Sequence, residues 1–425
     1  MANILLSFYD STPNKKGFLC YYDSIIRELL SKNNNVMAIN IAAFSDDWLE
    51  REWEKKDLLY IRNKVEEFKP DLAIAFNHQI FPGFYNLDCE TVIWDGDGYS
   101  YFACKNEFRK KIKDIKLITG YKKWISNYRS LGIDANNIFH IAPATAVKKE
   151  NLEKDKNISF IGTNFYYEYI HTDNPYYLYE KYLYFLNSKS YDYRNIANIP
   201  FHSESDLYGL FDIRNITLIH LLDLGLHLYG IGWDRVSIPQ LVYAYDKTSV
   251  YTLADNSYIY NSSKIAISIS HPQTKGQAFP WRIFDIMASS ACLVSSYSEE
   301  LKELTQEHCN LPMYRTPIEA HDICQKLLKD NVLRNEIVAA SNEYIDKHAR
   351  WIMRFKQLEE IFGIKLCNDA KFGKFTILKP ESFYIGNWSI RILHDKHNNE
   401  KKKKKKIIKI KIWPNTRLEL KKNST

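Results

Sequence analysis

A carboxylate at the start of a predicted helix is the residue of this sequence best placed to do chemistry. Asp285 follows a loop that contains Gly276 and Pro280, and a run of small residues after it leads into the apolar segment Cys292–Val294. This order predicts a loop, a helix and a strand, with the carboxylate in the first turns of the helix. The free N–H groups of a helix N-terminus can bind a diphosphate, and a carboxylate can accept hydrogen bonds from both hydroxyls of a ribose. Asp285 is therefore a candidate nucleotide-binding residue, and a carboxylate that only stabilises the helix end is the alternative.

Arg282 lies three residues before Asp285 and could contribute to the same site. The guanidinium group offers a fork of donors that matches a phosphate, so Arg282 is a candidate for holding the diphosphate. A surface ion pair is the alternative for this residue.

Two predicted strands end in glycine, where a parallel sheet places its ligands. Residues 158–161 are followed by Gly162, Thr163 and Asn164, and residues 226–229 are followed by Gly230, Ile231 and Gly232. Glycine lets the backbone approach a phosphate closely, and Thr163 or Asn164 can donate hydrogen bonds to it, although glycine at a strand end is also ordinary turn chemistry. Trp233 could stack on a base or belong to the core.

These segments resemble the donor-binding half of glycosyltransferases with the GT-B fold, in particular the CgeB-like, spore-maturation group. Arg282-Ile283-Phe284-Asp285 and the run from Ala288 to Val294 carry one family pattern, with Asp in place of Glu and no Gly among the small residues. Leu226 to Trp233 is similar to the family segment LYG-x-GW, and Ile158 to Asn164 to the strand that opens the second domain. The resemblance covers about residues 155–363. It implies two Rossmann-like domains facing a central cleft, a nucleotide-sugar donor, and no metal or other cofactor.

The resemblance also points to Gln277. Many retaining GT-B enzymes carry two Glu residues separated by seven others, and the second of them holds the ribose. In this sequence the corresponding pair is Gln277 and Asp285. Gln277 cannot supply a negative charge, so the sequence departs from the retaining pattern and does not indicate the stereochemistry of the transfer.

The first half of the chain would then supply the acceptor site and a catalytic base. Two polar loops follow predicted strands there, with His78 after residues 71–76 and Asp97 after residues 91–94. An inverting transfer needs a base that takes a proton from the acceptor hydroxyl, and a carboxylate or a histidine can do so. We predict Asp97 as the base, with His78 as the second choice.

Asp95 and Asp97 together have another interpretation. An Asp-x-Asp pattern after an apolar strand is how GT-A glycosyltransferases bind a divalent metal on the diphosphate, because hard oxygen ligands suit Mg²⁺ or Mn²⁺. A GT-A chain would lack the second nucleotide-binding half that residues 155–310 indicate. A metal-dependent GT-A enzyme therefore remains the less favoured alternative, beside a non-catalytic GT-B-like module that binds nucleotide or glycan.

Apolar segments alternate with helical patterns along most of the 425 residues. Alternation of this kind predicts an α/β fold with parallel sheets. We expect an acceptor-side Rossmann-like domain over 1–147, a charged linker, a nucleotide-sugar-binding domain over 158–345, a helix crossing back over 346–366, and a C-terminal extension over 367–425.

The positive charge of the chain is concentrated at its end. Residues 400–425 hold eleven Lys and Arg against two Glu, a net charge of +9, whereas the whole chain carries +7, so residues 1–399 sum to −2. Alternation of Ile and Lys over 407–412 predicts an amphipathic strand. A basic segment with interleaved apolar residues suits an anionic membrane surface, and a solvated end is the alternative. The near-neutral body argues against a nucleic acid partner.

Seven scattered cysteines without C-x-x-C spacing and the lack of an apolar run of eighteen residues predict a cytoplasmic protein without a membrane span. Taken together, the sequence predicts a glycosyltransferase that moves a sugar from a nucleotide-sugar to a glycan or lipid-linked acceptor in surface polysaccharide or glycoconjugate synthesis. The basic tail would allow peripheral association with the inner face of the membrane.

Overall fold

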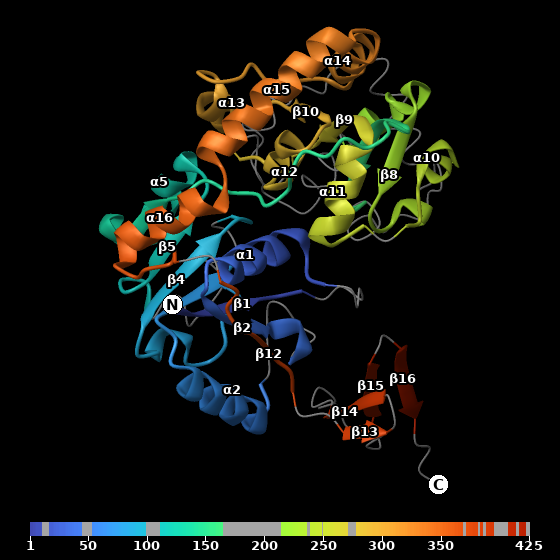
Figure 1. Ribbon diagram of the computed structural model, residues 1–425. Helices are drawn as coiled ribbons and strands as arrows, with labels where there is room; N and C mark the ends of the chain where they lie inside the picture. Colours follow the sequence, from blue (N-terminus) through green and yellow to red (C-terminus); the bar gives the residue numbers. More distant parts are fainter. Residues whose placement is uncertain are drawn as a thin grey trace.

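The computed structural model describes residues 1–10, 17–44, 53–98, 111–164, 214–235, 239–248, 250–270, 278–368 and 371–380, and the strands within 383–421. Figure 1 shows two lobes, one built mainly from the first third of the chain and one from the middle. Each lobe contains a parallel sheet with helices against it.

The first sheet has seven parallel strands in the order β12-β2-β1-β3-β4-β5-β6. Its strands are β1 (Asn3–Phe8), β2 (Asn35–Asn40), β3 (Leu72–Phe76), β4 (Glu90–Asp95), β5 (Lys116–Thr119), β6 (Ile138–His140) and β12 (Phe375–Leu378). The central strands are apolar and buried on both faces, as expected for a parallel sheet covered by helices. The helices of this lobe are α1 (Cys20–Ser31), α2 (Lys55–Phe68) and α5 (Ile125–Ser130).

The second sheet has five parallel strands in the order β11-β10-β9-β7-β8. They are β7 (Lys156–Ile161), β8 (Leu226–Tyr229), β9 (Ser263–Ser268), β10 (Cys292–Ser296) and β11 (Met313–Tyr314). The helices are α10 (Pro239–Ala244), α11 (Leu253–Asn261), α12 (Arg282–Ala288), α13 (Glu299–Thr305), α14 (Pro317–Lys329) and α15 (Asn331–His348). Local sequence fixes several helix starts: Thr252 and Asp255 form a capping box on α11, and Thr316 caps α14, which begins with proline.

The last helix, α16 (Trp351–Phe362), leaves the second lobe and packs on the first. Trp351, Phe355 and Leu358 belong to the same apolar cluster as β1 and α1, and the Trp351 indole donates to Ser24 Oγ at 2.6 Å. Side chains also join the lobes directly, since the Tyr121 hydroxyl donates to the Phe279 carbonyl. Two Rossmann-like domains that face one another make this the GT-B fold, as the sequence predicts.

The C-terminal extension contributes more structure than the sequence indicates. Strand β12 pairs with β2 and becomes the edge of the first sheet, with Leu378 buried in its core. After it, β13 (Phe383–Ile385), β14 (Trp388–His394), β15 (Ile407–Trp413) and β16 (Thr416–Lys421) form an antiparallel sheet, drawn in red beside the first lobe in Figure 1. The predicted amphipathic strand is thus present as β15. Residues 407–413 and 416–421 pair with their neighbours in this antiparallel sheet.

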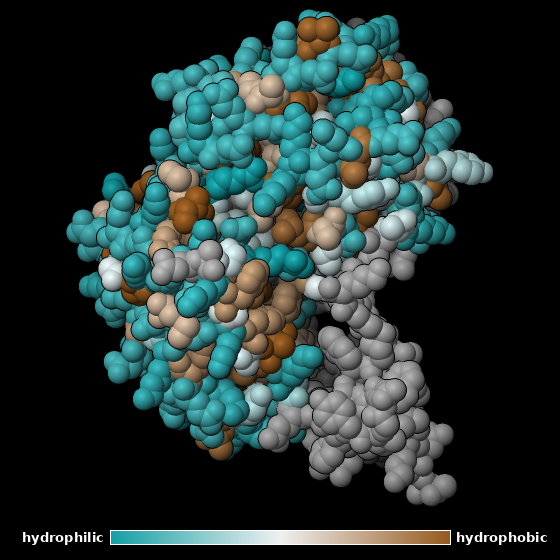
Figure 2. Space-filling model, viewed as in Figure 1, coloured by the Kyte–Doolittle hydropathy of each residue, from teal (hydrophilic) through white to brown (hydrophobic). Residues whose placement is uncertain are grey.

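On the face shown in Figure 2, hydrophilic residues cover most of the described surface of both lobes. Hydrophobic residues appear between them in small groups. Among the described residues, no helix is both long and apolar enough to span a membrane.

Candidate active site

The carboxyl ends of both sheets open onto one cavity of about 450 Å³ between the lobes. Ligands of parallel sheets bind at this edge, where neighbouring connections run in opposite directions. The volume lies in the range of small-molecule sites. The first lobe contributes the start of α1 and the loops after β3 and β4, and the second contributes the loops after β7 and β8 and the start of α12. The cavity therefore touches both domains.

On the second lobe, the ends of β7 and β8 lie unusually close together. Gly230 has a φ of +115°, and a Cβ atom there would lie 2.4 Å from the carbonyl oxygen of Gly162. Only glycine fits this contact without moving the backbone. Because Gly162 and Gly230 carry no side chains, the backbone itself faces the cavity at the end of β7.

Arg282 lies against this bare backbone. Its Nη1 is 3.2 Å from the position that a Cβ on Gly162 would take, and this buried nitrogen has no hydrogen-bond partner among the residues that the structure describes. A buried guanidinium nitrogen without an acceptor is costly. An anionic oxygen in the cavity would supply the acceptor.

The structure adds a second arginine that the sequence analysis missed. Arg214 is 4% exposed and lines the cavity, and its Nη1 donates to the Thr163 carbonyl at 2.9 Å. The signal in the sequence is an arginine two residues before the largely apolar run Ile216–Leu221, because a charged residue is seldom buried unless it has a partner or a ligand. Arg214 and Arg282 together make the second-lobe wall of the cavity positive.

Asp285 lies on the same wall, in the first turn of α12 as predicted. It is 7% exposed, and its Oδ1 accepts a hydrogen bond of 2.6 Å from the Thr145 hydroxyl. Burial raises the pKa of Asp285 to about 6, although the bond from Thr145 and the charge of Arg282 oppose the rise. One carboxylate oxygen of Asp285 therefore accepts a hydrogen bond from the first lobe, and the Asp285 side chain also lines the cavity.

Asp97 faces this wall from the first lobe. Asn77 Nδ2 donates to Asp97 Oδ2 at 2.6 Å, and Asn77 Oδ1 accepts from the Gly96 N–H at 2.7 Å, so one amide holds the whole turn. Asp97 is open to the cavity, yet the surrounding protein excludes part of the water and raises the pKa of its carboxyl to about 6. A base with this pKa is mainly ionised at neutral pH and can still accept a proton.

Several predicted residues lie elsewhere. His78 is 4% exposed and does not line the cavity; its ring lies beside that of Tyr85, with 6.4 Å between the centroids. Asn77 and His78 both adopt positive φ angles, and the side chain that reaches the cavity belongs to Asn77.

Asp95 is fully buried and also lies away from the cavity lining. Its carboxylate accepts hydrogen bonds from the Tyr128 hydroxyl and from the Gly98 N–H. Burial raises its pKa to about 7. Asp95 therefore holds the turn that presents Asp97. The GT-A alternative is wrong, because the chain has two Rossmann-like domains and Asp95 is directed into the first.

Trp233 belongs to the core of the second lobe. It is fully buried, packs edge-on against Phe160, and donates to the Gly162 carbonyl at 2.8 Å. Asn164 is 1% exposed and bonds the Gly232 carbonyl at 3.2 Å instead of reaching the cavity. Gln277 lies outside the described residues. Of the predicted donor-binding residues, Gly162, Thr163, Gly230, Arg282 and Asp285 line the cavity.

Aromatic side chains form the walls near the junction of the lobes. Tyr21 at the start of α1 packs edge-on against Trp281, with 5.6 Å between the ring centroids, and both line the cavity. Tyr251 closes another side, and its hydroxyl donates to Asp10 Oδ1 at 2.5 Å across the two lobes. Within the described ranges, no three His, Cys, Asp or Glu side chains come together as metal ligands would.

Residues 214–360 match the family described as glycosyl transferase-like. The match starts at Arg214 and includes β8, Arg282 and Asp285. No curated protein is similar enough in sequence to count as a match.

Solved structures with a similar arrangement include HepE from Anabaena in complex with UDP and glucose, at 10% identity and a TM-score of 0.47, covering 85% of this chain and 100% of that one. WaaG, a glycosyltransferase involved in lipopolysaccharide biosynthesis, has 11% identity and a TM-score of 0.47 over the same shares of the two chains. Sucrose-phosphate synthase from Thermosynechococcus elongatus has 10% identity and a TM-score of 0.46, covering 85% and 98%.

Proposed function

We propose that this chain, a glycosyltransferase of the GT-B fold, moves a sugar from a nucleotide-sugar on its second domain to a glycan or lipid-linked acceptor on its first. One observation carries the proposal: a single cavity is lined by two arginines and a carboxylate of one lobe and by a second carboxylate of the other. The motifs around Arg282 and Trp233 support placing the chain in the CgeB-like group.

The donor would bind along the second-lobe wall. Arg282 and Arg214 would neutralise the diphosphate beside the bare backbone of Gly162 and Gly230, where Thr163 could donate to it. Asp285 would accept the ribose hydroxyls with the oxygen that Thr145 leaves unused. The two arginines provide the charge that stabilises the leaving diphosphate, so we propose that the transfer needs no metal.

Asp97 would act as the base in an inverting transfer. The acceptor hydroxyl loses its proton to the Asp97 carboxylate while its oxygen forms a bond to the anomeric carbon of the sugar. The bond from that carbon to the diphosphate oxygen breaks at the same time, and the diphosphate leaves with both electrons. The aromatic pair Tyr21 and Trp281 gives the acceptor sugar an apolar surface to pack on.

The test combines ligand binding with turnover. Thermal unfolding measured with UDP-, GDP-, CMP- and ADP-sugars should show one preferred donor, since a ligand at 100 times its Kd stabilises by about 2.7 kcal/mol. Release of the nucleotide from that donor should then depend on an added glycan acceptor and persist in EDTA. Binding without any turnover would favour a non-catalytic module, and loss of activity in EDTA that Mn²⁺ restores would contradict the metal-independent mechanism.

We further propose that the protein acts in the cytoplasm at the inner face of the membrane, where lipid-linked acceptors are found. The +9 charge of residues 400–425 supports this, because each Lys near anionic headgroups contributes about 1 kcal/mol.

A further inference from the structure

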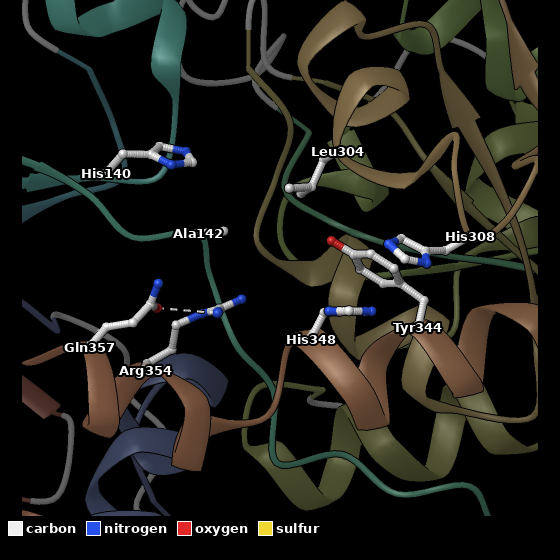
Figure 3. Close-up of a pocket in the computed structure, with 8 residues that line it drawn as sticks. All are labelled: His140, Ala142, Leu304, His308, Tyr344, His348, Arg354 and Gln357. Carbon is white, nitrogen blue, oxygen red and sulfur yellow. Dashed lines mark hydrogen bonds between the residues drawn. The ribbon is translucent and has the colours of Figure 1, made fainter.

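A second cavity, of about 220 Å³, lies where the two lobes and the crossing helix meet. It shares no lining residue with the cavity described above. Figure 3 shows His140 and Ala142 approaching from the first lobe, Leu304, His308, Tyr344 and His348 from the second, and Arg354 and Gln357 from α16. The residues that could carry charge here are one arginine and three histidines.

Arg354 is a buried cation without a matching anion. It is 6% exposed, and its Nε and Nη2 donate to the Pro143 carbonyl at 3.2 and 3.0 Å. Its Nη1 donates to Gln357 Oε1 at 3.3 Å. All of these acceptors are neutral, and in the described part of the chain no Asp or Glu forms an ion pair with it. Burial of a charge is expensive unless an opposite charge compensates it.

The histidines surround the same space. The rings of His308 and His348 are tilted by 35° to one another, with 4.4 Å between their centroids. His140 reaches in from β6, and within the described part of the chain its buried Nε2 has no hydrogen-bond partner. The nearest carboxylate is that of Glu300, 3.8 Å from this nitrogen, and Glu300 already accepts the Lys122 N–H at 2.9 Å. One guanidinium group and three imidazole rings therefore line the cavity, and the carboxylate of Glu300 lies beside one of the rings.

We propose that this cavity binds a small dianionic oxyanion, a free phosphate or the phosphoryl group of a small phosphorylated molecule. The anion would pair with the Arg354 guanidinium, whose remaining N–H groups match two phosphate oxygens. It would also accept hydrogen bonds from His140 of the first lobe and from His308 or His348 of the second. A bound anion would therefore link the two domains behind the active site.

The histidines should make this binding depend on pH. Burial lowers the pKa of His140, helped by Lys122 and Arg354, and burial also lowers the pKa of His348, helped by His308, Lys347 and Arg354. Glu300 and Glu343 are the carboxylates near the cluster, and Glu343 pairs with Lys347 on the solvent side. A bound dianion favours protonated histidine, so binding takes up protons and tightens as the pH falls.

The experiment measures thermal unfolding of the full-length protein in sulfate, with chloride at equal ionic strength as the reference. Sulfate keeps its charge between pH 6 and 8, so a change in affinity over this range reports on the protein. We expect a saturable rise in Tm that requires less sulfate at pH 6 than at pH 8. Arg354→Gln should abolish the rise.

Three further variants keep the test decisive. Lys356→Gln removes an exposed charge from the same helix and should leave the sulfate effect intact. Arg282→Gln should also leave it intact, which separates this cavity from the active site. If Arg354→Gln does not fold, His140→Gln replaces it and should weaken sulfate binding at pH 6 at least threefold. An effect no larger than that of chloride, or one that survives both Arg354→Gln and His140→Gln, would overturn the proposal.

The same assay identifies the source of the anion. Tighter binding of a hexose phosphate or glycerol phosphate than of inorganic phosphate, at one pH, would assign the site to an organic phosphate. Equal or weaker binding of the esters would assign it to free phosphate. Either result supports the site, because both require the Arg354-dependent pairing.

Discussion

At the scale of single residues, the proposed active site and the turn beside it contain carboxylates that differ in their surroundings. Asp95, Asp97 and Asp285 all have raised pKa values because burial disfavours their charged forms. Asp95 accepts hydrogen bonds from its own turn and from Tyr128 on α5, whereas Asp97 and Asp285 face the cavity from opposite lobes. The pKa values of the three carboxyl groups are all raised and do not distinguish them. Asp97 and Asp285 are functional candidates because they line the cavity, and Asp95 is structural because it does not.

We expect Asp285→Ala to weaken donor binding roughly ten- to hundredfold, because it removes charge-assisted hydrogen bonds worth about 1.5–3 kcal/mol. Thr145→Val is the matched control, since it removes the 2.6 Å bond to Asp285 and leaves the carboxylate in place. Titration calorimetry of both variants with the preferred nucleotide-sugar provides the measurement. A donor affinity unchanged in Asp285→Ala would remove this residue from the site.

We expect Asp97→Asn to lower kcat/KM by about 10²–10⁴, the usual contribution of a general base. In the wild type, kcat/KM should fall as the pH drops below about 6, because a protonated Asp97 cannot accept the proton of the acceptor. Asp285 titrates near the same pH, so donor affinity must be measured over the same range to separate binding from chemistry. Asp97→Asn with wild-type turnover would show that the base lies elsewhere.

At the scale of elements, the first sheet is completed by a strand from the far end of the chain. β12 pairs with β2 over four residues, and the backbone before it is tightly held, since a Cβ on Gly373 would lie 1.8 Å from the Asn34 carbonyl oxygen. The edge of the first domain therefore depends on residues more than 300 positions away in the sequence.

We expect a chain that ends after Asn368 to be less stable than one that ends after Pro380. The longer chain keeps β12 and the buried Leu378, and deletion of a buried leucine side chain alone costs about 2–5 kcal/mol. Denaturation in urea compares the two, and full-length Gly373→Ala should resemble the shorter chain. Equal midpoints for the two truncated chains would mean that β12 adds nothing to the stability of the domain.

At the scale of the whole molecule, the excess positive charge and the two Rossmann-like domains lie in different parts of the chain. The body sums to −2 and contains both Rossmann-like domains, while the +9 segment lies within and around β15 and β16. Truncation at residue 400 would divide the antiparallel sheet, because β14 would lose its pairing with β15 and keep only β13 as a neighbour. The end of β12 is the better boundary for a test of the charge.

We expect removal of residues 381–425 to reduce binding to vesicles that contain phosphatidylserine and to leave hydrolysis of a soluble donor unchanged. Binding of the full-length chain should fall as salt rises, because screening limits the reach of its charges to about 8 Å at physiological ionic strength. Co-sedimentation with anionic and with neutral vesicles provides the comparison. Equal binding by the two chains would exclude a membrane role for this segment.

The sequence alone determined the α/β architecture and the local order around Asp285. Alternating apolar and helical segments, the strand ends at Gly162 and Gly230, and the acidic residue in the first turn of α12 are all encoded over a few neighbouring residues. Local periodicity and turn chemistry are short-range, so a sequence displays them directly. The resemblance to GT-B glycosyltransferases depends on these same segments.

Tertiary structure decided which side chains meet. Asn77 and His78 are adjacent polar residues, and both adopt positive φ angles. Asn77 lines the cavity, whereas His78 does not. Trp233 belongs to the core, because the close contact of β7 with β8 buries the indole. Arg214, for which the sequence analysis predicted no role, lines the cavity. Neither β12 nor the Arg354 cavity has a local signal, since each depends on segments that only the folded chain brings together.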